Sequence, residues 1–263
     1  MPDVDIFPYF LTPQETNPDK PLFIFLPGMD ESEKLAVLQI ASVKTAFNIR
    51  CLVIQPEYME SWDILADRVI TLTQAELEAT PQHQIVYLCG ESFGGCLALK
   101  VLVKAPKLFE RVILVNPASS FNRRPWIHWG SLFTRWLPQW LYQMFSVVVL
   151  PFLAAGSRMT SEARQALLES VRSVPIETSV QRLSLMRDFD MDEGRLQQFT
   201  QPVLLIAGKD DVLLPSVAEV KRLEKIFPDS RVVTLPHSGH ACLLETDVNL
   251  YEIMQSANFL EDL

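Results

Sequence analysis

The chain has 263 residues, a formal net charge of -9 and a sequence pI near 5.0. This acidic balance, without a long basic run or Cys/His pairs at zinc-ligand spacing, argues against a nucleic-acid partner. Hydrophobic residues make up 48% of the chain, which is enough for a sizeable core. The length fits one large α/β domain, so we expect a single domain over residues 1–263.

The N-terminus and the cysteines indicate a reducing compartment. Asp3 and Asp5 stand where a secretion signal would carry lysines, and prolines follow in place of an apolar segment. The four cysteines are scattered, and we expect all of them to be buried structural thiols: Cys51, Cys89, Cys96 and Cys242. The sequence therefore favours a cytoplasmic protein.

In chain order, short apolar runs bounded by turn residues predict strands that are buried on both faces. These runs are residues 22–26, 50–54, 85–89, 111–115, 203–207 and 231–235. Helical patterns alternate with them at 33–47, 62–79, 93–104, 217–227 and 244–260. The alternation predicts a mostly parallel sheet with helices on both faces. The residues before position 22 leave room for at most one extra edge strand.

The alternation breaks between residues 118 and 201, which predicts a helical cap inserted between two core strands. Four of the five tryptophans gather there: Trp126, Trp129, Trp136 and Trp140. The longest apolar stretch, 145–155, is shorter than the roughly 20 residues that a bilayer-spanning helix needs. The segment is either a cap whose apolar face packs on its neighbours or a lid that faces lipid. Trp136 and Trp140 are our candidates for substrate binding and for peripheral membrane contact.

A nucleophile motif follows the third predicted strand. The run VYLCGESFGG places Gly90, Ser92 and Gly94 as a G-x-S-x-G pattern directly before a helix. A serine on such a sharp turn needs small residues two positions away on either side, because strand and helix come too close for a Cβ atom. Ser92 is therefore a candidate nucleophile. Glu91, at the variable position, is a candidate pocket residue that either lines the pocket or points to solvent.

A serine hydroxyl is a weak nucleophile, so it requires a base and an acid that orients the base. The acid candidates lie in AGKDDVLLP, after the strand predicted at 203–207, and are Asp211 and its neighbour Asp210. The base candidates lie in PHSGHACLLE, after the last predicted strand, and are His240 and the preceding His237.

These motifs resemble a known superfamily. GESFGG, GKDDVLLP and SGHACLLE are similar to the α/β-hydrolases at their three catalytic positions, over about residues 21–260. The resemblance implies an α/β-hydrolase fold and, from the family's offsets, the triad Ser92, Asp211 and His240. More narrowly, FLPGMD, ESFGGCLAL, LVNPASSF and LLPS resemble the hydrolase portion of the plant plastid phytyl ester synthases and their cyanobacterial relatives, an esterase, lipase and thioesterase group.

The resemblance also implies an oxyanion hole, which needs two convergent backbone donors. One is the amide of Phe93, the residue after the nucleophile. The other is the amide of Met29, in the Pro27-Gly28-Met29 turn after the first apolar strand, with Gly28 beside Ser92. No metal or organic cofactor is implied.

The sequence thus favours a serine esterase, lipase or thioesterase that acts on a small hydrophobic acyl ester or a lipid. Three alternatives stay open. The first is acyl transfer to phytol or another lipid alcohol, although this chain lacks the H-x-x-x-x-D motif of the plant proteins' acyltransferase domain. The second is a non-catalytic lipid-binding protein or receptor with a hydrolase fold. The third is a scaffold that docks to membranes through its aromatic cap.

Overall fold

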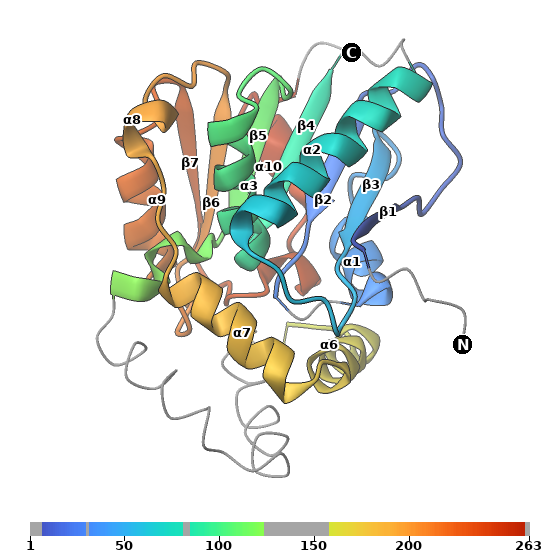
Figure 1. The fold of residues 1–263 in the computed structure, drawn as a ribbon, viewed down its shortest axis with the longest axis vertical. Helices are drawn as coiled ribbons and strands as arrows, with labels where there is room; N and C mark the ends of the chain where they lie inside the picture. The colour runs from blue at the N-terminus through green and yellow to red at the C-terminus, as the bar shows by residue number, and fades with distance from the viewer. Residues whose placement is uncertain (1–6, 30–31, 81–84, 124–157, 261–263) are drawn as a thin grey trace.

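A seven-stranded sheet forms the centre of the computed structural model, which describes residues 7–29, 32–80, 85–123 and 158–260 (Figure 1). The strand order is β1-β3-β2-β4-β5-β6-β7. The strands are β1 Tyr9–Leu11, β2 Leu22–Leu26, β3 Asn48–Val53, β4 Val86–Glu91, β5 Arg111–Val115, β6 Val203–Gly208 and β7 Ser230–Leu235. Only β1, at one edge, is antiparallel among these described strands. The predicted parallel sheet with one extra edge strand is confirmed.

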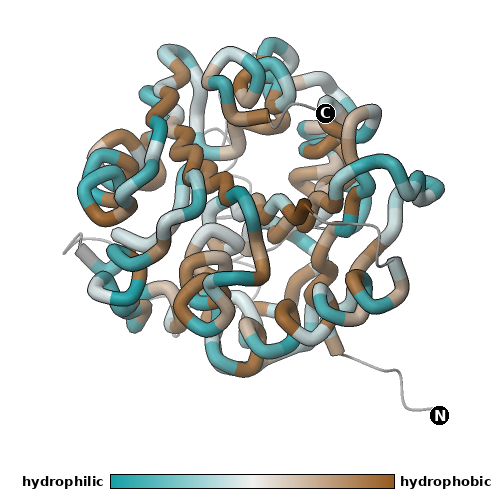
Figure 2. The backbone as a smooth tube through the Cα atoms, turned by 90° about the horizontal axis from the view of Figure 1, so that it is seen from above, coloured by the Kyte–Doolittle hydropathy of each residue, from teal (hydrophilic) through white to brown (hydrophobic). Residues whose placement is uncertain are grey.

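Helices cover both faces of the sheet (Figure 1). The helices α2 Trp62–Ala79, α3 Phe93–Lys104 and α9 Ser216–Glu224 pack against one face, and α1 Glu33–Gln39 and α10 Leu250–Ser256 against the other. Successive strand residues point to opposite faces, so Leu22 and Ile24 join the first core cluster while Phe23 and Phe25 join the second. Figure 2 shows the result, with hydrophobic strands in the middle and helices of mixed polarity around them.

The expectation of strands buried on both faces holds for β2, β3, β4 and β6, where every residue is buried. It is wrong for β7, whose residues are all at least partly exposed. The reason is its position, since β7 is the last strand of the sheet and has a neighbour on one side only.

Two predicted helices are too long. The helix expected over 33–47 ends at Gln39, because the following turns close through three-residue hydrogen bonds, such as Val43 N–H to the Ile40 carbonyl at 3.1 Å. The helix expected over 244–260 is divided into a short turn, η3 Cys242–Leu244, and α10. The side chain of Asn249 accepts a hydrogen bond from the Glu252 N–H and starts α10 afresh.

The described part of the segment between β5 and β6 contains helices: η1 Ala118–Arg123, α6 Ser161–Ser173, α7 Ile176–Arg187 and α8 Glu193–Leu196. In Figure 1, α6 and α7 lie below the sheet, on the side where β5 leads into η1. The indole N–H of Trp62 donates to the Leu185 carbonyl at 2.9 Å and joins α2 to α7. The four tryptophans predicted for the cap lie outside the described residues.

The cysteine prediction is confirmed, since all four cysteines are buried and none forms a disulfide. Within the part of the chain that the structure describes, no helix combines the length and the hydropathy needed to cross a membrane.

Candidate active site

Ser92 occupies a strained turn between β4 and α3. Its φ of 53° lies in the left-handed region that residues with a side chain rarely adopt. A Cβ atom on Gly90 would lie 2.4 Å from the Gly94 carbonyl oxygen, and one on Gly94 would lie 1.9 Å from that of Leu26. The flanking glycines are therefore required by close packing of the strand, the turn and the helix, as the motif predicted.

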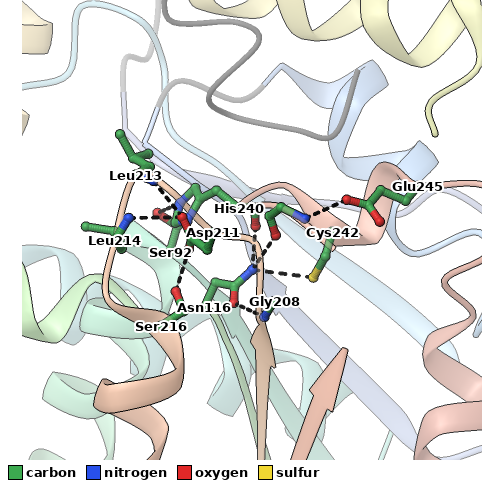
Figure 3. Close-up of polar contacts among 11 residues, drawn as sticks. Ser92, Asn116, Gly208, Asp211, Leu213, Leu214, Ser216, His240, Cys242 and Glu245 are labelled. Atoms are coloured by element: carbon green, nitrogen blue, oxygen red, sulfur yellow. Dashed lines mark hydrogen bonds and ion pairs between the residues drawn. The ribbon is translucent and has the colours of Figure 1, made fainter. Parts of the chain in front are cut away.

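Ser92, His240 and Asp211 form a continuous hydrogen-bonded chain (Figure 3). His240 Nε2 lies 2.8 Å from Ser92 Oγ, and His240 Nδ1 lies 2.7 Å from Asp211 Oδ2. The three residues follow β4, β7 and β6, whose carboxyl ends meet at one edge of the sheet. The side chains of Asp211 and His240 are 1% and 6% exposed. A nucleophile, a base and an acid thus lie in series, and the side chains of the base and the acid are shielded from solvent.

The surroundings of Asp211 stabilise its charged form. Oδ1 accepts the backbone N–H groups of Leu213 and Leu214, both at 2.9 Å, and Oδ2 accepts the Ser216 hydroxyl at 2.5 Å. Burial by itself raises the pKa of Asp211, but attraction to His240 and the hydrogen bonds outweigh burial and lower that pKa. An ionised carboxylate only accepts, so Nδ1 of His240 must donate, and Nε2 is left to accept the Ser92 proton.

The alternative acid and base lie elsewhere. Asp210 is exposed, and its backbone N–H donates to the Ser238 carbonyl at 3.1 Å. His237 is also exposed, and its carbonyl accepts a hydrogen bond from Arg158 at 2.9 Å. The structure therefore brings Asp211 and His240, and not their neighbours, to Ser92.

The two predicted oxyanion donors lie beside the nucleophile turn. Phe93 is the first residue of α3, and the N–H groups of a first helical turn have no partner within the helix. The turn that holds Gly28 and Met29 abuts the same helix, because a Cβ atom on Gly94 would also lie 2.6 Å from the Pro27 carbonyl oxygen. Among the described residues, the Met29 and Phe93 N–H groups donate to no other group. Their role in the reaction stays a prediction.

Of the other candidate pocket residues, the structure describes Glu91. Glu91 is 2% exposed and accepts a hydrogen bond from Gln39 Nε2 at 2.7 Å, so it does not point to solvent. Trp136 and Trp140 lie outside the described residues.

Several residues that contact the site were not predicted from the sequence. Ser216, the first residue of α9, donates to Asp211. Arg182 of α7 is buried and donates to the Met29 carbonyl at 2.5 Å and to the Gln55 carbonyl at 2.9 Å. Asn116 follows β5 and contacts both the acid loop and the base loop. The available signal for Asn116 was its place in LVNPASSF, a polar residue directly after a buried strand.

Comparisons with known proteins place the chain in a fold family. A family model for the alpha/beta hydrolase fold matches residues 26–247. Phytyl ester synthase 1 of Arabidopsis thaliana chloroplasts is 29% identical over 260 residues, which cover 90% of this chain but only 37% of that protein. The pimeloyl-[acyl-carrier protein] methyl ester esterase of Nitrosomonas europaea is 29% identical over 199 residues, covering 72% of this chain and 77% of the relative.

Solved structures show the same fold. The enol-lactonase of Burkholderia xenovorans superposes with a TM-score of 0.74 at 16% identity, covering 95% of this chain and 94% of the other. The chain belongs to the α/β hydrolase fold family. Within that family its sequence is similar to an esterase and to part of a phytyl ester synthase.

Proposed function

We propose that the chain is a serine hydrolase that cleaves carboxylic esters or thioesters of hydrophobic acyl groups through an acyl-enzyme. The observation that carries this proposal is the hydrogen-bonded series from Ser92 through His240 to Asp211. Such a series activates a hydroxyl that is otherwise a weak nucleophile.

In the proposed reaction, His240 Nε2 takes the Ser92 proton while Oγ attacks the acyl carbon. The backbone amides of Met29 and Phe93 hold the oxygen that becomes negative, and the ionised Asp211 stabilises the imidazolium. His240 then gives its proton to the leaving alcohol or thiol as the carbon–oxygen or carbon–sulfur bond breaks. A water molecule, deprotonated by His240, releases the acyl group as a carboxylic acid and restores Ser92.

The substrate class is inferred from the segment between β5 and β6 and from the relatives. We propose that residues 118–201 form a cap over the strand ends, and that Trp136 and Trp140 contact the acyl chain or a membrane surface. Tryptophan suits both roles, because its large apolar ring carries one polar N–H. The similarity to a pimeloyl-[acyl-carrier protein] methyl ester esterase and to a phytyl ester synthase supports a hydrophobic acyl group.

The test compares lipid extracts incubated with the wild type and with Ser92→Ala by mass spectrometry. Esters or thioesters should disappear and free acids should accumulate only with the wild type, and a fluorophosphonate should label only the wild type. Ser184→Ala is a control, because its hydroxyl bonds the Val180 carbonyl of its own helix. Equal turnover by wild type and Ser92→Ala would refute the proposal. An unlabelled wild type would favour a non-catalytic binding protein.

Acyl transfer to a lipid alcohol is a second candidate, because the similarity to phytyl ester synthase 1 covers 90% of this chain. It requires that an alcohol, and not water, attacks the acyl-enzyme. A time course with a long-chain alcohol as acceptor separates the two reactions. Ester formation in excess of free acid would support transfer, and free acid alone would support hydrolysis.

Contact between the cap and a membrane is tested by replacing Trp136 and Trp140 together with alanine. We expect weaker binding to vesicles and a lower kcat/KM for long-chain esters, with little change for acetyl esters. A folded double variant that binds vesicles like the wild type would exclude the membrane contact.

A further inference from the structure

Asn116 lies at the centre of the strand ends that carry the triad. It directly follows β5, and its backbone N–H donates to the Ile206 carbonyl of β6 at 2.9 Å. Its side chain is fully buried, with 0% exposure, and its φ is 42°. A buried amide must have both its donor and its acceptor satisfied, and a residue other than glycine at positive φ is uncommon. Both features suit an asparagine, which tolerates positive φ and carries both a donor and an acceptor.

The side-chain amide of Asn116 connects the acid loop to the base loop (Figure 3). Its Oδ1 accepts the N–H of Gly208 at 2.8 Å, at the end of β6 and three residues before Asp211. Its Nδ2 donates to the main-chain carbonyl of His240 at 2.6 Å and lies 3.2 Å from that of Gly239. The Asn116 side chain thus forms a hydrogen bond with the backbone of His240, the proposed base.

The two loops touch at this point. A Cβ atom on Gly208 would lie 2.4 Å from the Gly239 carbonyl oxygen, so the loops are in van der Waals contact. The opposite side of the base loop is also held, because Glu245 Oε1 accepts the Gly239 N–H at 2.8 Å. The backbone of Gly239 and His240 is therefore fixed between an amide on one side and a carboxylate on the other.

We propose that Asn116 is a positioning residue, which sets the separation of the acid and base loops and thereby aims the His240 imidazole at Ser92. The inference rests on the proposed function, since it assigns a role within the same triad. An amide is suited to this place because it offers one acceptor to Gly208 and one donor to His240. An ionised aspartate of the same shape offers acceptors only.

The principal test is Asn116→Asp, with Asn116→Gly as a second variant that tolerates the positive φ but removes the amide. The readouts are the rate of fluorophosphonate labelling at Ser92 and the kcat/KM for a p-nitrophenyl ester. We expect both rates to fall about 10- to 100-fold, because a misplacement of about 1 Å in a catalytic group has effects of that size. Asn258→Asp is the matched control, since Asn258 also has a positive φ, 50°, but is exposed at the end of α10.

A positioning role is distinguished from a purely structural one by repeating the substitution in a His240→Ala background. There, Asn116→Asp should lower the residual hydrolysis by less than about twofold, because two changes that act through one group are not additive. Equal losses in both backgrounds, or no loss in the wild-type background, would overturn the inference. So would unfolding of both Asn116 variants, because the amide would then serve stability. If the wild type itself is not labelled at Ser92, the proposed function fails instead.

Discussion

Replacing Asp211 by asparagine should disable the base without disturbing its surroundings. Oδ1 of Asp211 accepts two backbone N–H groups, from Leu213 and Leu214, so the oxygen of the new amide must occupy that position. The NH2 group then faces Ser216 and His240, where Oδ2 stood. Because this group only donates, Nδ1 of His240 must become the acceptor. The ring proton moves to Nε2, which can then no longer accept the Ser92 proton.

The size of the effect follows from this loss of the correct tautomer. In serine proteases the same change lowers kcat by about 10⁴-fold, and we expect a loss of about 10³- to 10⁴-fold here. At about 1.36 kcal/mol per factor of ten, the loss corresponds to about 4 to 5.5 kcal/mol of transition-state stabilisation. The fold should persist, since the side chain keeps its volume and its bonds to the two N–H groups.

The assay is steady-state hydrolysis of a p-nitrophenyl ester, with circular dichroism to check the fold. Asp210→Asn is the matched control, because Asp210 is exposed one position away, and it should retain at least about half of the activity, as surface changes usually have small effects. A folded Asp211→Asn variant with more than about a tenth of wild-type kcat would contradict the tautomer argument. A larger loss from Asp210→Asn would contradict the assignment of the acid.

Three further outcomes follow from the structure. Gly94→Ala should lower the free energy of unfolding by about 1–3 kcal/mol or more, because its Cβ would lie 1.9 Å from the last carbonyl oxygen of β2. Gly194→Ala, whose Cβ would have its nearest neighbour at 3.4 Å, should be neutral or slightly stabilising. Urea unfolding of the two variants tests this difference. Arg182→Met should lower kcat about 10-fold with less effect on KM, because the turn that carries Met29 loses the charged hydrogen bond from Arg182 to the Met29 carbonyl. An unchanged kcat would show that this hydrogen bond has a structural role only. The lowered pKa of Asp211 means that its charge stabilises the fold above the unfolded-state pKa of 3.8, and this contribution is lost as pH falls through the folded-state pKa. The difference in the free energy of unfolding between wild type and Asp211→Asn should therefore shrink on acidification below about pH 4. A difference that stays constant with pH in urea titrations would contradict this prediction.

Local patterns in the sequence predicted much of the fold and the chemistry. Apolar runs located the six parallel strands to within about two residues. For the strands that are buried on both faces, the reason is that all residues must be apolar or paired. The G-x-S-x-G motif located Ser92 on its turn, because the packing of strand against helix excludes a Cβ atom at Gly90 and Gly94. Helix ends were predicted less well, since three-residue turns after Gln39 and the cap at Asn249 depend on a few local bonds.

The contacts that complete the site were decided by the tertiary structure. Asn116 and His240 are 124 positions apart, and Arg182 and Met29 are 153 apart. Nothing in the periodicity of either segment indicates such pairs, because they depend on strand order and on the placement of α7 across the strand ends. The sequence by itself therefore determined which residues carry the proposed chemistry. Only the folded chain determined which residues hold them in place, because those bonds join segments that are far apart in the sequence and are neighbours only in the tertiary structure.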